Sequence, residues 1–207
     1  MGQKIHPLGF RLGITRDWVS RWYSDKKSFS KNLSEDYKIR QFLKKRFEPA
    51  GLKSVEIERS ANEISITVKV AKPGMVIGKG GLEEVEKELK KMTKSKIRLT
   101  AEEVKNPELE AQLVADYISR QLKKRLPYKR IANSAIRSAM EKGAKGIKIK
   151  FSGLLSGGNS IARTEILKEG SIPAQTLRAD VDYAQVHCQM LFGTIGVKVW
   201  IYRGEFS

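Results

Sequence analysis

Two stretches of strict alternation constrain the fold of this chain more than any other feature of its sequence. Apolar residues occupy every second position of residues 64–70 and of residues 197–201, with polar or aromatic residues between them. Because successive side chains of a strand point to opposite faces of a sheet, each stretch predicts a strand with one buried face. Residues 55–57 and 147–151 repeat the pattern, so the sequence predicts one sheet in each half of the chain.

Helical periodicity flanks these strands. We expect one helix to begin near Ser34, a good N-cap followed by Glu35 and Asp36, and to end before Pro49 and Gly51. Apolar residues at helical spacing predict the buried stripe of this helix and of three more: Ile39, Phe42, Leu43 and Phe47; Leu82, Val85, Leu89 and Met92; Ala111, Val114, Ile118 and Leu122; Tyr128, Ile131, Ala135 and Ala139.

The segment VKNPELE, residues 104–110, is the best candidate for a domain boundary, because Asn106 can cap a helix and Pro107 can take its first position. The predicted fold class is α+β. We divide the chain into a basic N-terminal arm (residues 1–30), a first domain with a three-stranded sheet and helices (31–105), and a C-terminal domain with two helices and an antiparallel sheet (106–207).

The charge of the chain indicates its partner. The 40 Lys and Arg residues exceed the 23 Asp and Glu residues and give a formal net charge of +17. This excess favours a polyanion, with nucleic acid as the first expectation and an anionic membrane as the second. No apolar run reaches the roughly 20 residues of a membrane span, so we expect no membrane partner.

The sequence contains no pattern that predicts a metal or cofactor. The single cysteine, Cys188, cannot form an internal disulfide, and no zinc-ligand spacing is present. Asp180 and Asp182 share one face of a strand, and we expect them to pair with Arg178 or with RNA-facing arginines rather than to bind a metal. We therefore expect no metal, no cofactor and no catalytic residues.

The glycine-rich stretch PGMVIGKGG, residues 73–81, indicates a phosphate ligand. A nucleotide-binding P-loop needs four residues between its glycines and a hydroxyl after its lysine. Here three residues separate Gly74 from Gly78, and Gly80 follows Lys79, so neither condition is met. A dinucleotide-binding fingerprint fails on spacing as well. The last four residues instead form a G-x-x-G loop, which between two helices, after two strands and before a third, resembles the type II KH arrangement.

Such a loop lets a sugar-phosphate backbone approach closely because its glycines carry no Cβ atoms, and the following helix offers free N–H groups. Lys79 adds a positive charge, and Val76 and Ile77 are expected to line the neighbouring groove for bases. The alternative is a glycine-rich turn without a ligand. The RNA contacts expected around the loop are Lys72, Gly78, Lys79, Gly80 and Gly81.

A second basic feature is the run RQLKKRLPYKR, residues 120–130, which holds six basic residues and no acid. On two helices that meet at Pro127, its charged side chains lie opposite the buried stripes. The alternative is an ordinary solvated helix face, but such a face usually mixes both signs of charge. We expect phosphate contacts from Arg120, Lys123, Lys124, Lys129, Arg130 and Arg137.

The N-terminal arm combines basic and aromatic residues without clear periodicity. Its aromatic rings have two open roles, which are stacking on bases and anchoring of the arm to the fold. The arm residues expected to contact RNA are Lys4, Arg11, Arg16 and Trp18.

Several motifs resemble the family of the third protein of the bacterial small ribosomal subunit. They follow the family's order from Met1 to about Glu205: MGQKIHPLGFRLGI, KPGMVIGKGG, GAKGIKI, ARTE, KEGSIPAQTLRADVDY and GTIGVKVWIYRGE. The resemblance implies a type II KH domain and a family-specific C-terminal α+β domain. It also implies a place in the head of the small subunit, with ribosomal RNA and neighbouring ribosomal proteins as partners, and a share in the channel through which mRNA enters.

The implied roles fall on particular residues. Lys129 and Arg130 occupy positions at which the family grips incoming mRNA, whereas Asn133 and Ser134 stand where it commonly has further basic residues. Arg163 and Arg178, within the motifs above, join the expected contacts to ribosomal RNA. The implied location is a cytoplasmic ribosome, with a bacterial-type organellar ribosome as the alternative.

Two other functions are weighed against the ribosomal one. Some members of the family are associated with cleavage of abasic DNA through a lysine Schiff base, which requires a lysine with a depressed pKa. Lys123, Lys124 and Lys129 are crowded, but no acid pair or metal cluster completes such a site. The third alternative is a free-standing KH regulator of RNA, against which the ending IGVKVWIYRGE and the basic arm argue.

Overall fold

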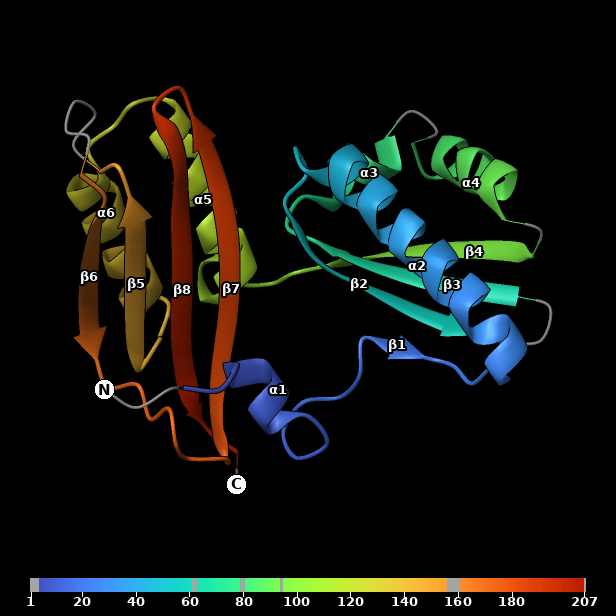
Figure 1. The fold of residues 1–207 in the computed structure, drawn as a ribbon, viewed down its shortest axis with the longest axis horizontal. Helices are drawn as coiled ribbons and strands as arrows, with labels where there is room; N and C mark the ends of the chain where they lie inside the picture. The colour runs from blue at the N-terminus through green and yellow to red at the C-terminus, as the bar shows by residue number, and fades with distance from the viewer. Residues whose placement is uncertain (1–3, 61–62, 79–80, 94, 156–160, 207) are drawn as a thin grey trace. The chain divides into compact units, whose positions relative to one another are not determined.

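The structure, a computed structural model, describes residues 4–60, 63–78, 81–93, 95–155 and 161–206. The chain folds into two compact units, one of Trp18–Lys105 and one of Met1–Asp17 together with Asn106–Ser207 (Figure 1). The expected α+β class is confirmed. The N-terminal segment, however, is divided between the two units and is not one separate irregular arm.

The first unit has a mixed sheet with helices on one face. Its strands lie in the order β1-β2-β3-β4, with β2 antiparallel to β3 and both outer pairs parallel. The expected type II KH order of elements is present, and the short β1 is an additional edge strand. The elements are β1 (Ser20–Arg21), α2 (Lys26–Phe47), β2 (Leu52–Arg59), β3 (Glu63–Val70), α3 (Pro73–Ile77), α4 (Gly81–Met92) and β4 (Lys96–Glu103).

The alternating apolar residues of the strands and most of the predicted helical stripes form the core of this unit, as predicted. Phe42 and Leu82 are only half-buried against it. Met92, the last residue of α4, is 44% exposed. The buried core consists of Ile39, Leu43, Phe47, Ala50, Val55, Ile57, Ile64, Ile66, Val68, Val70, Val76, Val85, Leu89, Ile97 and Leu99.

Helix α2 begins at Lys26, well before the expected start at Ser34. Asp25 takes the N-cap position, and its backbone carbonyl accepts hydrogen bonds from the N–H groups of Ser28 and Phe29 at 3.0 and 2.9 Å. Local propensity favoured Ser34 because it precedes two acids. The expectation was wrong because contacts made elsewhere on α2 stabilise its first turns.

Asp36 makes the most important of these contacts. Its side chain was expected in the first helical turn but is buried in the middle of α2. Trp22 Nε1 and Arg59 Nε donate hydrogen bonds to its two carboxylate oxygens at 2.8 and 2.7 Å. The ring of Trp22 also packs on Phe29, with centroids 5.4 Å apart. The segment before α2 and the end of β2 are therefore held against the helix.

The second unit is an antiparallel sheet with two helices on one face (Figure 1). Its strand order is β6-β5-β8-β7, and the expected pair of helices with an antiparallel sheet is confirmed. The elements are α1 (Pro7–Arg11), a 3-10 turn (Pro107–Leu109), α5 (Ala111–Lys123), α6 (Tyr128–Glu141), β5 (Gly146–Gly153), β6 (Arg163–Gly170), β7 (Ala179–Met190) and β8 (Gly193–Glu205).

The core of this unit lies between the sheet and α5 and α6. Tyr128, expected in the stripe of α6, is half-buried and meets Phe151 edge-on, with ring centroids 5.7 Å apart. The other expected core residues are buried: Ala111, Val114, Ile118, Leu122, Ile131, Ala135, Ala139, Ile147, Ile149, Phe151, Val197, Val199 and Ile201.

Arg11 fastens the N-terminal segment to this unit. Its side chain is fully buried at the end of α1, and burial lowers its pKa, with the neighbouring Arg16 adding to the effect. Backbone carbonyls replace the water that the guanidinium has given up. At 2.8–3.3 Å the guanidinium donates to the carbonyls of Pro7, Pro173, Ala174, Thr176 and Ala179.

Two aspartates of β7 join the same region to α5. Asp180 Oδ1 accepts a hydrogen bond from Arg16 at 2.8 Å, and Asp182 Oδ2 lies 3.4 Å from Arg203 Nη2. Asp182 Oδ2 also accepts a hydrogen bond from the backbone N–H of Ala111 at 2.8 Å, so it caps α5 from a strand 71 residues away in sequence. Pro107 was expected to begin this helix, but it begins the 3-10 turn before it.

We expect Arg11→Ala to destabilise the second unit by about 3 kcal/mol, because it leaves several buried carbonyls without donors. Hydrogen exchange followed by mass spectrometry on the full chain should show faster exchange in peptides of β7 and β8, with β2 and β3 unchanged. The control is Arg178→Ala, whose side chain is 72% exposed and which should leave both units unchanged. Unaltered protection of β7 in the Arg11 variant would contradict the anchoring role.

Candidate nucleic-acid interfaces

The glycine loop joins α3 to α4 in the first unit. Gly78 follows the last residue of α3, and its N–H donates to the carbonyl of Gly74, whereas Gly81 is the first residue of α4. Lys79 and Gly80 lie outside the described residues. Lys72 is exposed just before α3. The two described ends of the loop therefore stand between two helices, as the sequence predicted.

The two described glycines of this loop differ in what the fold requires. A Cβ at Gly81 would lie 2.5 Å from the carbonyl oxygen of Val76, so α3 and α4 approach too closely for any side chain there. A Cβ at Gly78 would meet no atom within 4 Å, and the φ of −62° at Gly78 suits any residue. Glycine at 81 serves packing, whereas glycine at 78 leaves room for an external chain.

The residues of α3 divide between core and surface. Val76 is 1% exposed and belongs to the core, so the expectation that its side chain lines a groove is wrong. In this short helix, the positions on either side of Val76 point outward. Met75 and Ile77 are 60% and 57% exposed, and Ile77 is thus accessible as expected. These two apolar side chains are available beside the glycine loop.

Charge around the loop is mixed. The N-terminus of α4 favours anions through its free N–H groups, but Glu83 and Glu84 occupy its first turn. Glu84 lies 3.5 Å from Arg46, which offsets part of its charge. A phosphate bound at this loop would therefore depend on close backbone approach at Gly78 more than on a dense positive field.

The second candidate surface lies on α5, α6 and the turn between them. We call it the α5–α6 basic surface. In the part of the chain that the structure describes, none of its side chains forms an ion pair with an acid. It therefore combines high positive charge with exposure to solvent. Its members are all exposed: Arg120, Lys123, Lys124, Arg125, Lys129, Arg130 and Arg137.

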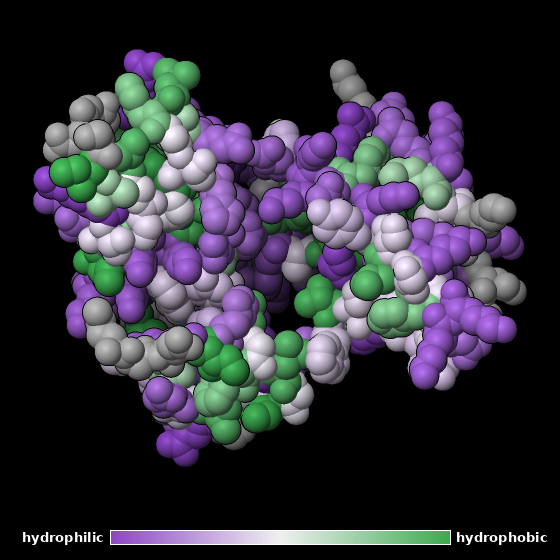
Figure 2. Space-filling view, viewed as in Figure 1, coloured by the Kyte–Doolittle hydropathy of each residue, from purple (hydrophilic) through white to green (hydrophobic). Residues whose placement is uncertain are grey.

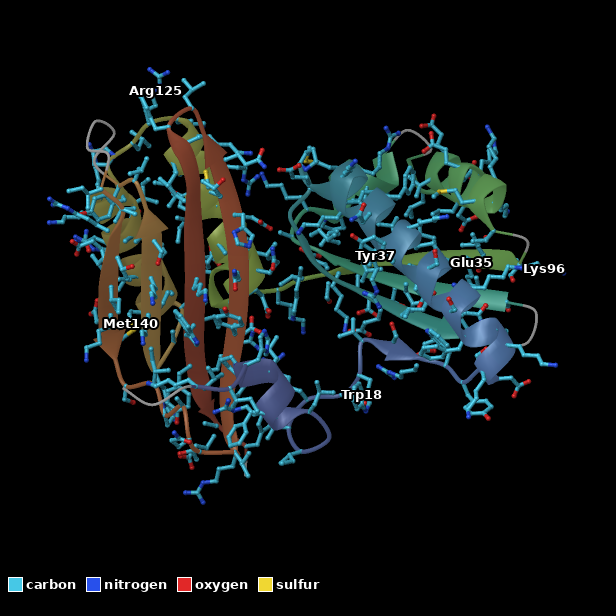
Figure 3. The ribbon with its side chains drawn as sticks, in the orientation of Figure 1. Trp18, Glu35, Tyr37, Lys96, Arg125 and Met140 are labelled. Carbon is cyan, nitrogen blue, oxygen red and sulfur yellow. The ribbon has the colours of Figure 1, made fainter. Side chains whose placement is uncertain are left out.

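Arg125 occupies a strained position in this turn. Its φ is 61°, in the left-handed region, and Leu126 N donates back to the carbonyl of Gln121 at 3.4 Å. This is the helix-ending geometry in which glycine is usual. A non-glycine residue there costs on the order of 1 kcal/mol. Figure 3 shows the Arg125 side chain pointing outward from the turn, so the strain presents one more charge on the surface.

Lysine-based chemistry would require a desolvated lysine. Lys123, Lys124 and Lys129 are all exposed. The described segments contain no group of three or more His, Cys, Asp and Glu residues that could hold a metal ion. They also contain no helix long and apolar enough to cross a membrane.

The arm residues have separate environments. Lys4 and Trp18 are exposed, with Trp18 at 62%. Arg16 is half-buried and pairs with Asp180, so part of its charge is already neutralised. Arg11 is fully buried among carbonyls, and the expectation that it contacts RNA is not supported because its guanidinium has no exposed donor.

The last two expected contacts lie in the second unit, Arg163 at the start of β6 and Arg178 directly before β7. Arg163 is exposed at the start of β6. Arg178 is 72% exposed and pairs with Glu205 at 2.7 Å, so it is not the partner of the β7 aspartates as one alternative held. The structure thus leaves both arginines accessible, with Arg178 partly neutralised.

Two family models match the chain. Residues 38–109 match the KH domain, and residues 118–201 match the description "Ribosomal protein S3, C-terminal domain". The fold, the glycine loop and the first match together define a KH-domain protein.

Curated relatives extend the match to the whole chain. Small ribosomal subunit protein uS3 of Dictyoglomus turgidum is 50% identical over 208 residues, which cover 99% of this chain and 84% of the relative. The proteins of that name from Carboxydothermus hydrogenoformans and Pelagibacter ubique are 49% and 50% identical over 207 residues, covering 99% of this chain and 93% and 91% of the relatives. The chain belongs to the uS3 family of small ribosomal subunit proteins.

A pair of alanine substitutions tests the two glycine roles. We expect Gly81→Ala to lower the free energy of unfolding by about 1–3 kcal/mol, because the added Cβ would clash with the backbone of α3. Gly78→Ala should leave it unchanged or raise it slightly, because the space is open and φ is compatible. Urea unfolding of the full chain measures both. Equal destabilisation by the two substitutions would contradict the assignment.

Arg125→Gly should raise stability by about 1 kcal/mol, because it relieves the left-handed strain, and should weaken RNA binding, because it removes a charge. The matched control is Arg125→Ala, which removes the charge and keeps the strain. Urea unfolding and filter binding to a short single-stranded RNA give the two readouts. A glycine variant with undiminished RNA affinity would exclude Arg125 from the binding surface.

Proposed function

We propose that this chain is a structural component of the small ribosomal subunit that binds ribosomal RNA. One observation carries the proposal: the chain matches proteins named for this subunit along 99% of its length. The charge of +17 and the exposed α5–α6 basic surface support it, because both suit a polyanionic partner. The proposed location is the ribosome, cytoplasmic or in an organelle of bacterial type.

The finer part of the proposal concerns mRNA. The α5–α6 basic surface grips incoming message near the channel through which mRNA enters the subunit head. Lys129 and Arg130, at the family's gripping positions, are both exposed at the start of α6. Asn133 and Ser134 are exposed on the same helix but uncharged, so fewer phosphates are neutralised there. The grip is therefore weaker along α6 than a continuous basic face would allow.

The remaining expected contacts are proposed for ribosomal RNA. The glycine loop takes a sugar-phosphate backbone against Gly78, where the fold leaves open space. Exposed Trp18 offers a ring for stacking. Arg11 is left out because it is buried. The proposed set is Lys4, Arg16, Trp18, Lys72, Gly78, Lys79, Gly80, Gly81, Arg163 and Arg178, and neighbouring ribosomal proteins complete the surroundings.

Sedimentation tests the ribosomal role. A lysate of cells that express the tagged full chain is fractionated on sucrose gradients at low and high salt. Co-sedimentation with small subunits supports the proposal. A wholly free pool at both salt concentrations would contradict it and favour the alternative of a free-standing RNA regulator.

The mRNA grip has its own test. We expect Lys129→Ala combined with Arg130→Ala to slow translation of messages with stable hairpins more than translation of unstructured ones, because it removes two phosphate-binding charges where the message must be held. In vitro translation with purified ribosomes measures both rates. Asn133→Ala with Ser134→Ala, two uncharged changes on the same helix, is the control. Equal slowing of translation for both kinds of message would contradict the proposed role of Lys129 and Arg130 in holding mRNA.

A further inference from the structure

The sheet of the second unit has a second face, which α5 and α6 do not cover. Alternate residues of all four strands form it, because their neighbours along each strand point to the side of the sheet that α5 and α6 cover. We call this surface the lysine face. Its three rows, read from β6 through β5 and β8 to β7, are Thr164, Ser152, Gly196 and His187; Ile166, Lys150, Lys198 and Gln185; and Lys168, Lys148, Trp200 and Tyr183.

The charges on this face are all of one sign. None of its twelve positions holds an acid, and four hold lysine. Lys148 stands directly opposite Lys168 on β6, and Lys150 directly opposite Lys198 on β8. Like charges that face each other across strands destabilise a sheet. Among the described residues, no acid on this face offsets the repulsion.

The surroundings of Lys148 show the repulsion. Burial lowers the pKa of Lys148, and the charges of Lys4, Lys150 and Lys168 lower it further. Its ammonium lies 5.0 Å from the centroid of the Trp200 ring, which is an attraction but not a neutralising charge. A polyanion laid over the face would relieve the mutual repulsion of these lysines.

The N-terminal segment adds an aromatic ring to the lysine face at Tyr183 of β7. The His6 ring meets Tyr183 edge-on at 4.8 Å, and Tyr183 lies 5.1 Å from Trp200, measured between ring centroids. The lysine face lies toward the viewer in Figure 1, with the helices behind the strands. From the same side, Figure 2 shows mainly hydrophilic and intermediate colours over the middle of this sheet. It is a polar, cationic platform with aromatic rings at one end.

The spacing of the lysines suits a phosphate chain. Residues two apart on a strand are separated by about 7 Å, and adjacent strands by about 4.8 Å. Four ammonium groups therefore fall within a patch that spans only a few phosphates of one nucleic-acid strand. Protein partners are a poorer match, because lysine is depleted in the buried centres of protein–protein interfaces.

We propose that the lysine face is a further RNA-binding surface, which takes the sugar-phosphate backbone of an RNA strand. It lies on the side of the sheet opposite α5 and α6. The chain therefore contacts RNA on both sides of its second unit. This inference deepens the proposed function, on which it rests, since it assigns RNA contact to residues that neither the glycine loop nor the α5–α6 basic surface includes.

A photo-crosslink on the face tests the proposal. Gln185, which is exposed in the middle row, is replaced by p-benzoylphenylalanine in the full chain. The probes are a short single-stranded RNA, a short RNA duplex and polyglutamate. We expect crosslinks to RNA, and we expect Lys150→Gln with Lys198→Gln to reduce their yield on the order of tenfold in dilute salt.

Two variants are matched controls. Lys150→Arg with Lys198→Arg keeps the charge and should keep the crosslink, and Lys123→Gln with Lys124→Gln removes two charges from the opposite side and should leave the yield at Gln185 unchanged. The salt dependence gives a second readout. The slope of log affinity against log salt should flatten by about 0.7 for each single-strand phosphate that the glutamine variant no longer neutralises.

The outcomes separate this proposal from the general one. RNA binding in a filter assay without any crosslink at Gln185 would overturn the lysine face and leave the proposed function standing. Preferential crosslinking to polyglutamate would overturn it as well and assign the face to an acidic protein instead. Failure of the unmodified chain to bind any RNA would contradict both proposals.

In the absence of RNA, the chain with Lys150→Gln and Lys198→Gln should be at least as stable as the parent chain, because the repulsion between the two lysines is relieved.

Discussion

The carboxylate of Asp182 lies where three parts of the second unit meet. It caps the first N–H of α5, pairs with Arg203 of β8 and, with Asp180, holds Arg16 of the N-terminal segment. Such buried groups are costly unless each finds its partners, so the cluster orders the helix, the strand and the segment together. Arg11, a few residues from Arg16, is satisfied by carbonyls in the same region.

The first unit uses its buried acid in the same way. Asp36 binds Trp22 and Arg59 and so draws the start of α2 onto the sheet. Acids that are engaged inside the units do not neutralise the cationic surfaces. The α5–α6 basic surface and the lysine face have no acidic partners among the described residues, and both remain available to a polyanion.

The periodic elements could be predicted because their signals are local. Alternation at residues 64–70 and helical spacing on α5 follow directly from which face is buried. Local signals could not predict that α2 starts at Lys26 or that the N-terminal segment is divided between the two units. Both depend on side chains that meet from distant positions, such as Asp36 with Arg59. Propensity at Ser34 is worth too little to compete with such contacts.

The sequence alone determined four features: the α+β class, the positive charge, the glycine loop and the resemblance to a ribosomal family. Each of them depends on composition or on short-range spacing. Only the tertiary structure decided which basic residues face solvent. Arg11 and Lys129 look alike in sequence, yet one is buried among carbonyls and the other is exposed. Likewise Lys150 and Lys198 become neighbours only through strand pairing, since register, and not sequence distance, determines which charges meet.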